Sequence, residues 1–202
     1  AQGYQCVGIN PANLSSYSNS TFNLFNISIG LNTNAFSISN YNAVNGANME
    51  DTLSISYYPK SDFYESFNGD GMRFMQSLKL PFPGINFSKQ NFALTSSLST
   101  NIDMGLPNGL IDLILNGNTF GKNIAIDIEQ FISITQETGV SYGHSFDKFS
   151  TGITLKYILG MFYMGMESID NPYISTDITG FTGQNQYIIQ QAIGGSGTGL
   201  DI

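Results

Sequence analysis

Side chains able to carry out catalysis or bind metals are scarce in this sequence. His144 is the single histidine and Cys6 the single cysteine. A Ser-His-Asp triad would depend on His144, and neither a disulfide within the chain nor a site of several His or Cys ligands can form. The glycine-rich stretch 194–199 fits neither the dinucleotide-binding pattern nor the P-loop, which ends in Lys-Ser or Lys-Thr. The sequence therefore predicts no enzyme activity, no metal and no cofactor.

Charged residues on the polar phase of the predicted strands are better candidates for contact with a solute. Glu137 and Lys156 lie on opposite arms of a predicted hairpin, in which Glu137 pairs with Ile158 and Lys156 with Gly139. The two charges are then diagonal neighbours on one face. They predict either an internal ion pair that holds a plug or a group that contacts a solute. The predicted set of such charges is Asp103, Asp127, Glu129, Glu137 and Lys156.

This hairpin is predicted over Phe131–Tyr163, with its turn at Asp147-Lys148. Apolar residues occupy even positions before the turn and odd positions after it, and the opposite face is small or polar. A two-residue turn pairs Phe146 with Phe149 and keeps paired residues on one face. The switch from even to odd is therefore what a hairpin requires.

The length of the two arms indicates a membrane β-barrel. Each arm has about 15 residues, against roughly 5–6 in soluble proteins and about 9–11 needed to cross a bilayer. Charged residues make up 11% of the chain, well below the roughly 25% of soluble domains. No apolar run reaches the roughly 18 residues of a spanning helix, so insertion would be by strands. The net charge of −8 argues against nucleic acid as a partner and leaves membrane lipid as the expected one.

Four further strands are predicted from alternation of apolar and polar residues. The first starts at Phe25, slips in phase near Asn34 and resumes at Phe36 and Ile38. The last starts near Gln184 and runs through residues 194–199 to 202. The other two cover Met72–Leu80 and Phe92–Leu106. Ile124, Ile126 and Ile128 also alternate and lead into the hairpin.

The connections are predicted from turn residues and from breaks in the alternation. Residues 40–71 and Glu167–Gly183 are rich in Asn, Asp, Gly or Thr and read as long loops. Between them, Asn108 can cap a short apolar helix that stops at Gly117 and is expected to be buried against the barrel mouth.

The count is about six membrane-length strands, joined alternately by short turns and long loops. Because the smallest single-chain barrels have about eight strands, six cannot close. We expect either a larger barrel of which this chain is the N-terminal portion, or a partner that completes the sheet. Residues 1–19, polar and rich in turn residues, are predicted to form a plug, and residues 20–202 the barrel strands and loops.

Aromatic residues on the apolar phase indicate where the lipid interface would lie. Membrane barrels carry aromatic girdles at both interfaces, although aromatic residues also favour strands in general. His144 falls on the same phase near the turn, where an interfacial role is favoured over catalysis. The predicted interfacial aromatics are Tyr142, Phe149, Tyr157 and Tyr163.

Short motifs along most of the chain resemble those of Bacteroidota outer-membrane barrels of the FadL/PorV type, particularly an uncharacterised branch. The element Gly8–Leu14 is similar to the Asn-Pro-Ala element of that family's plug. The other motifs are the turn at 80–85, Tyr142-Gly143 before the tight turn, the stretch 155–161, and residues 197–202, which resemble the start of a next strand.

The resemblance implies a fold and a range of functions. The fold is an antiparallel transmembrane β-barrel of about 14 strands in the bacterial outer membrane, with a lumen that leaves room for a plug. The functions are uptake of hydrophobic compounds or assistance to type IX secretion. The residues that match the plug element are Asn10, Pro11, Ala12 and Asn13.

Three hypotheses follow. The first is a plugged barrel that is a passive conduit or receptor for a hydrophobic or small solute, which needs a pocket lined by both plug and wall. The second is a non-transporting barrel that docks on or plugs a type IX secretion translocon, which needs a surface complementary to that partner. The third is a soluble secreted β-sandwich that acts as an interaction module, which would bury the even face of residues 132–146.

Overall fold

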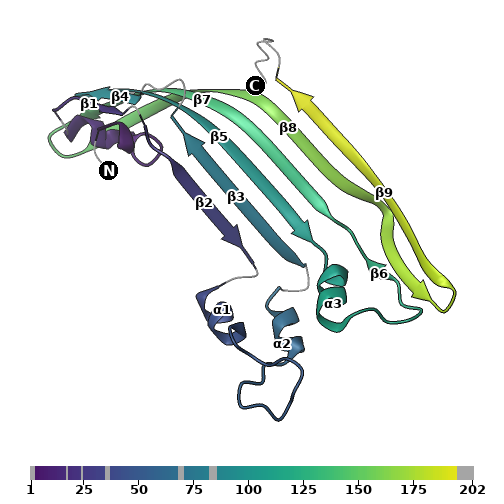
Figure 1. Ribbon diagram of the computed structural model, residues 1–202. Coiled ribbons are helices and arrows are strands. Elements are labelled where there is room, and N and C mark those ends of the chain that lie inside the picture. The colour runs from purple at the N-terminus through teal and green to yellow at the C-terminus, as the bar shows by residue number, and fades with distance from the viewer. Residues whose placement is uncertain are drawn as a thin grey trace.

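One antiparallel sheet dominates the structure (Figure 1). The computed structural model describes residues 3–16, 18–23, 25–34, 37–67, 71–81 and 86–194. Within these residues the sheet has nine strands. They are β1 (Thr21–Asn23), β2 (Ser28–Thr33), β3 (Met72–Leu80), β4 (Asn86–Lys89), β5 (Phe92–Leu106), β6 (Ile124–Ala125), β7 (Glu129–Ser145), β8 (Ser150–Asp177) and β9 (Gly180–Ile193).

The nine strands make a sheet that is six strands wide, because three short strands extend their longer neighbours. On one side of β5, β4 pairs with residues 92–94 and β3 with residues 98–106. In the same way, β1 pairs with β4 and β2 with β3, and β6 pairs with β8 beyond the end of β7. The width agrees with the predicted count of about six strands. Within the described residues the sheet is open, since β2 and β9 each pair on one side only.

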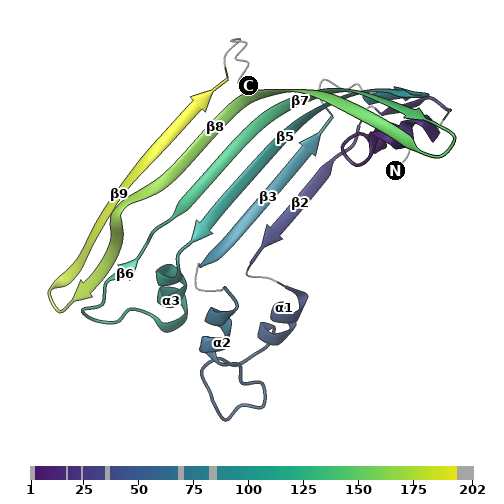
Figure 2. The ribbon, with the colours of Figure 1, turned by 180° about the vertical axis from the view of Figure 1, so that it is seen from behind.

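The two ends of the sheet differ in their connections. Tight turns at residues 90–91 and 147–148 join β4 to β5 and β7 to β8 at one end. At the other end, longer connections carry α1 (Ile38–Val44), α2 (Lys60–Glu65) and α3 (Asn108–Asn116). Both views show the three helices at this end and the N-terminal segment at the opposite end (Figures 1 and 2). The predicted alternation of short turns and long loops is therefore present, although the β8 to β9 turn at the helical end is also short.

The central hairpin has the predicted turn and register. The Phe146 N–H donates to the Phe149 carbonyl oxygen at 2.7 Å. Glu137 pairs with Ile158, and Gly139 pairs with Lys156, as predicted.

A bulge in β8 changes the register further along the hairpin. Thr135 pairs with Gly160 but Ile134 pairs with Phe162, so Met161 is left as the extra residue. A bulge of one residue exchanges the faces of all side chains that follow it. Tyr163 therefore pairs with Ser133 on the polar face, and its predicted place on the apolar face is wrong.

The predicted loop Glu167–Gly183 is also wrong, because β8 continues through it to Asp177 and β9 begins at Gly180. Asp170 and Asn171 have φ angles of 58° and 49°, a left-handed conformation that these two residue types tolerate. They interrupt the pairing of β8 with β9, which stops at Ile169 and resumes at Tyr173. The residues that looked like a loop thus form a kink inside a strand.

The structure differs from three local predictions. The alternation predicted to resume at Ile38 is instead the start of α1, whose N-cap is Ser37: its side chain accepts from the Asn40 N–H at 3.0 Å. The predicted helix α3 is present but its N-cap is Pro107. It is also not a buried helix, because Ile114 is 80% exposed while only Ile111 is buried. Phe36, the turn residues 82–85 and the predicted strand continuation over 195–202 lie outside the described residues.

The alternation gives the sheet two different faces. The apolar face carries Ile29, Leu31, Leu78, Leu94, Leu98, Val140, Tyr142, Ile153 and Leu155. The small-polar face carries Ser28, Ser77, Ala93, Thr95, Ser97, Ser141, Gly143, Gly152 and Thr154. Several large side chains on the apolar face are exposed, among them Leu31, Ile153 and Leu155, whereas Ala93 and Ser141 on the small-polar face are fully buried. None of the helices in the described part of the chain has the length and hydrophobicity to span a bilayer.

Candidate functional site

The N-terminal segment, residues 3–16, lies on the small-polar face at the end with the tight turns (Figure 1). It contains two short 3₁₀ helices, η1 (Gly3–Cys6) and η2 (Pro11–Ser16), and η2 contacts both β7 and β8. Cys6 and Leu14 are fully buried and pack with Ala93 of β5. The small side chains of this face therefore allow the N-terminal segment to pack closely against the sheet.

Two glycines opposite each other in the hairpin bring the backbone of η2 against the sheet. Gly143 pairs with Gly152. A Cβ atom on Gly152 would lie 2.4 Å from the nitrogen of Ala12, and one on Gly143 would lie 2.4 Å from the carbonyl oxygen of Pro11. Both distances are shorter than any van der Waals contact, so only glycine fits here without moving the segment.

The four predicted plug residues form the turn and the start of η2. The side-chain oxygen of Asn10 accepts from the Ala12 N–H at 3.1 Å, which fixes the entry into the helix. Pro11 and Ala12 supply the backbone that lies over the glycine pair, and Ala12 is buried. Asn13 is exposed. The residue that anchors the segment most deeply, Leu14, was inside the predicted motif but not among the predicted site residues.

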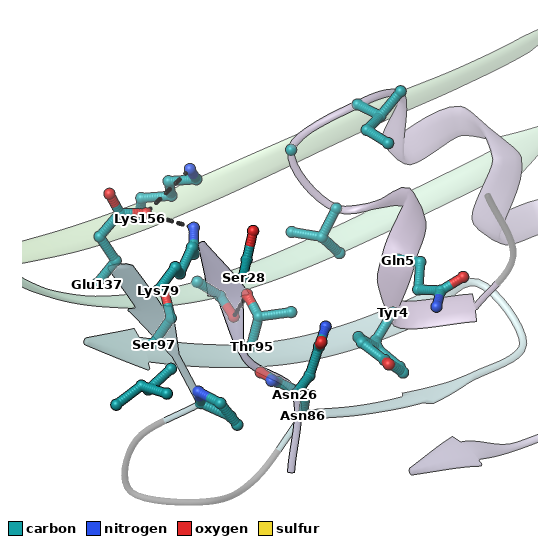
Figure 3. A pocket seen from close by; sticks show the side chains of 16 residues that line it. Tyr4, Gln5, Asn26, Ser28, Lys79, Asn86, Thr95, Ser97, Glu137 and Lys156 are labelled. Atoms are coloured by element: carbon teal, nitrogen blue, oxygen red, sulfur yellow. Dashed lines mark hydrogen bonds and ion pairs between the residues drawn. The ribbon is translucent and has the colours of Figure 1, made fainter. Parts of the chain in front are cut away.

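A pocket of about 500 Å³ lies between the N-terminal segment and the sheet (Figure 3). One wall is formed by residues 4, 5 and 7–9 of the segment. The other wall consists largely of the small-polar face, with contributions from β2, β3, β4, β5, β7 and β8. The residues from the sheet side are Asn26, Ser28, Lys79, Leu80, Pro81, Asn86, Thr95, Ser97, Glu137, Gly139 and Lys156.

Two lysines meet one glutamate at the edge of this pocket. The Nζ atoms of Lys156 and Lys79 lie 3.3 Å and 3.7 Å from the same oxygen, Oε2 of Glu137. The predicted pair of Glu137 and Lys156 is therefore present. Lys79 was not among the predicted charges, because its place beside Glu137 depends on the strand order β3-β5-β7, which the sequence does not show.

The other predicted charges lie away from the pocket. Asp103 forms a two-point ion pair with Arg73, with both N–O distances at 2.8 Å. Glu129 pairs with Gly105 in the ladder, near the helical end of the sheet. Asp127 is exposed and lies between β6 and β7, because β6 ends at Ala125 and the alternation at Ile126 and Ile128 does not continue as a strand.

The predicted interfacial aromatics separate into three locations. Tyr142 and Phe149 lie near the hairpin tip, in an aromatic chain in which the His144 ring contacts Phe146 at 4.7 Å. Tyr157 pairs with Thr138, well inside the strand. Tyr163 lies on the small-polar face, where its ring packs edge-on against Phe131 at 5.2 Å.

A polar network at the helical end was not predicted. The Tyr64 hydroxyl of α2 donates to Asp112 of α3 at 2.9 Å, and Lys122 donates to the other carboxylate oxygen at 2.7 Å. The hydrogen bonds from Lys122 and Asn116 lower the pKa of Asp112 to about 2. Burial, together with the contact to Asp112, raises the pKa of Tyr64 to about 12.

Within the described residues, no cluster of three His, Cys, Asp or Glu side chains that could hold a metal ion is present.

Comparison with protein families finds a match over residues 11–202, to a family described as "Family of unknown function (DUF5723)". No curated protein and no solved structure matches the chain. The family match covers η2 of the N-terminal segment and the whole of the sheet. The chain belongs to this family of unknown function.

Proposed function

We propose that this chain forms part of an outer-membrane β-barrel whose N-terminal segment is a plug, and that the barrel is a passive conduit or receptor for a small solute. The apolar face would contact lipid and the small-polar face would line the lumen. The resemblance to FadL/PorV-type barrels remains a prediction that agrees with this arrangement.

The apolar face supports a membrane location. Leu155 is 70% exposed, and its neighbours on the same face are exposed as well. Burying one such side chain is worth about 1.5–3 kcal/mol, so a continuous face of them needs an apolar environment. In a soluble β-sandwich a second sheet would cover this face. Within the described residues there is one sheet, and no second sheet covers it.

Strand length and the sheet edges agree with the same proposal. At 15 and 17 residues, β5 and β7 exceed the roughly 9–11 residues that a tilted strand needs to cross a bilayer. In lipid, each unpaired backbone group at an edge costs several kcal/mol. The edges at β2 and β9 would therefore be paired by further strands, either of the same polypeptide or of a partner.

The pocket is the observation that favours a conduit or receptor over a docking protein. A conduit with a plug needs space bounded by both plug and wall, and the pocket is lined by residues 4, 5 and 7–9 on one side and by residues of six strands on the other. A volume of about 500 Å³ falls within the range of about 300–1,000 Å³ typical of ligand sites.

Spin labels on neighbouring residues test the membrane orientation. The full-length polypeptide, with Cys6 replaced by serine, is labelled at Leu155 or at Thr154 and reconstituted into phosphatidylcholine vesicles. These adjacent positions lie on opposite faces of β8. We expect the label at 155 to collide mainly with oxygen, which dissolves in lipid, and the label at 154 to be shielded from lipid. A carbonate wash of the vesicles should leave the protein in the membrane.

Asn101 and Ile102 of β5 give a second pair of adjacent labelling positions that lie on opposite faces of the sheet. Asn101 lies on the small-polar face and is exposed, so a label there should collide with a water-soluble nickel chelate, whereas a label at 102 should not. If labels at 155 and 102 were reached by the nickel chelate as readily as the label at 101, the membrane orientation would be wrong.

A further inference from the structure

The charge of the pocket points to the class of solute. The residues that line it include two lysines and one glutamate as the only charged side chains. The pocket therefore has a net charge of about +1, although the chain as a whole carries −8. A local positive charge inside an acidic protein indicates a site for an anion.

The geometry leaves part of the lysine charge available. Both ammonium groups reach the same oxygen of Glu137, at 3.3 Å and 3.7 Å, so one carboxylate is shared between two cations. The Lys79 and Lys156 side chains are 51% and 39% exposed, whereas Glu137 is 24% exposed. The two lysine side chains thus remain accessible to a solute, while the Glu137 side chain is less exposed than either. An incoming anion would share the lysines with Glu137 or replace it as their partner.

The remaining lining combines polar side chains with a larger share of apolar surface. Ten of the sixteen lining residues have polar or charged side chains, and these are the ten labelled in Figure 3. Hydroxyl and amide groups come from Ser28, Thr95, Ser97, Asn26 and Asn86 along the sheet, and from Gln5 and Tyr4 of the N-terminal segment. Thr95 already donates to the Gly139 carbonyl oxygen, and Asn86 accepts from the Ser96 N–H. A long hydrocarbon chain would cover the other polar groups without offering them a hydrogen-bond partner, which costs binding energy. A hydroxylated solute would satisfy them.

We propose that the pocket binds a small, hydroxylated organic anion with a single carboxylate, held by Lys79 and Lys156. This inference rests on the proposed function, because it names the solute class of the same site. It also narrows that function, because the charge of the cluster favours an anion over an uncharged hydrophobic solute. The carboxylate lies at the Lys79–Glu137–Lys156 cluster, and the hydroxyl groups face the amide and hydroxyl side chains.

Calorimetric titration with D-gluconate tests the inference. The full-length protein in detergent micelles is titrated at low ionic strength with gluconate, with glucose as a neutral probe and with octanoate as an anion that has an apolar tail. We expect gluconate to bind, glucose to bind at least tenfold more weakly, and added salt to weaken gluconate binding. No gluconate binding, or tighter binding of octanoate than of gluconate, would overturn the inference.

Substitutions in the cluster give effects of opposite sign. Lys79→Gln and Lys156→Gln should each weaken gluconate binding by roughly tenfold, because each removes one charged hydrogen bond. Glu137→Gln should tighten it, because it removes the competing carboxylate. Arg73→Gln, which removes a cation of the same sheet outside the pocket, should leave the affinity unchanged. A cluster that serves only to hold the structure would predict that Glu137→Gln weakens binding or leaves it unchanged, and either result would contradict the proposal.

The experiments distinguish a failure of the membrane proposal from a failure of the proposed solute class. Protection of the Cys6 thiol from a maleimide shows that each variant retains the docked N-terminal segment, because Cys6 is buried only in the docked state. If the spin labels report lipid at 155 but gluconate does not bind, the solute class is wrong and the membrane barrel stands. If gluconate binds as expected but the labels report water at 155, the anion site stands and the membrane orientation is wrong.

Discussion

The two faces of the sheet are built from the same strands and show opposite patterns of burial. On the apolar face, large side chains near the hairpin tip are exposed, as at Tyr142, Ile153 and Leu155. On the small-polar face, Ala93 and Ser141 have no exposed surface, because the N-terminal segment covers them. Soluble proteins show the reverse, with large apolar side chains inside.

The difference lies in what each face can accept as a neighbour. A face of large side chains can be covered by any apolar medium, because its contacts need no particular geometry. A face of glycine, serine and alanine allows close approach of one particular backbone, here that of Pro11 and Ala12 over Gly143 and Gly152. The small-polar face is therefore the one whose contacts depend on the exact shape of its neighbour. Substitutions on the two faces should accordingly have different consequences.

Leu14→Ala should have the largest effect, on the small-polar side. Leu14 is fully buried, and truncating a buried leucine costs about 2–5 kcal/mol. Release of the segment exposes Cys6, so the rate of maleimide labelling should rise by about 30-fold to a few thousand-fold. Ile9→Ala, in the same segment but at a residue 77% exposed, should change the rate by less than about twofold. Equal effects of the two substitutions would show that the segment is not held by Leu14.

Leu155→Arg tests the apolar face. If this face contacts lipid, an arginine near the bilayer midplane costs about 2–4 kcal/mol, measured by urea unfolding of the protein folded into vesicles. Asn101→Arg, on the small-polar face, should cost less than about 0.5 kcal/mol. In water, a charged residue at a position as exposed as Leu155 has little effect. A cost near zero for Leu155→Arg would therefore remove the distinction between the faces.

Gly152→Ala should have an intermediate effect through the glycine pair. The added Cβ would lie 2.4 Å from the nitrogen of Ala12 and 2.5 Å from the carbonyl carbon of Pro11, and backbone atoms cannot give way as a side chain can. Overpacking of this kind costs about 1–3 kcal/mol, so Cys6 labelling should accelerate by about 5-fold to about 160-fold. Gly160→Ala is the matched control on the same strand, since nothing lies within 4 Å of its Cβ position. The control should label at the rate of the unchanged protein.

Local rules were sufficient to predict β3, β5 and the hairpin as far as Gly160. The predicted strands Met72–Leu80 and Phe92–Leu106 have the same bounds as β3 and β5. The turn at Asp147-Lys148 and the pairing of Gly139 with Lys156 were also correct. These features depend on a period of two and on one turn, both of which are visible in neighbouring residues.

Features that depend on distant contacts or on alternative local patterns were not predicted. The bulge at Met161 was missed because Met161, Phe162, Tyr163 and Met164 are all apolar or aromatic, so either phase fits. The register did place Gly143 opposite Gly152, and a glycine pair on one face could have indicated a closely packed neighbour. It did not show that the neighbour was η2. The place of Lys79 in the cluster likewise required the order of three strands.

The helical end should show the smallest effect, and its dependence on pH separates it from the docked N-terminal end. Asp112 has a pKa of about 2, below its ordinary value of 3.8, so its contribution to stability is present above pH 3.8 and is lost as the pH falls toward about 2. Tyr64 has a pKa of about 12, above its ordinary value of 10, so its contribution is present below pH 10 and is lost as the pH rises toward about 12. Hydrogen exchange in α2 and α3 should therefore be slowest, relative to the intrinsic rate, between about pH 4 and pH 10.

Asp112→Asn is the variant that tests this network. It removes the charge that Lys122 binds, so the acid dependence of exchange in α3 should disappear. It also removes a charge that keeps Tyr64 protonated, so the absorbance titration of Tyr64, identified by comparison with Tyr64→Phe, should move down from about 12. Cys6 labelling should be unaffected by Asp112→Asn, because the two regions lie at opposite ends of the sheet (Figure 1). A faster labelling rate in this variant would mean that the helical end and the plug are coupled, and that the small-polar face alone does not hold the N-terminal segment.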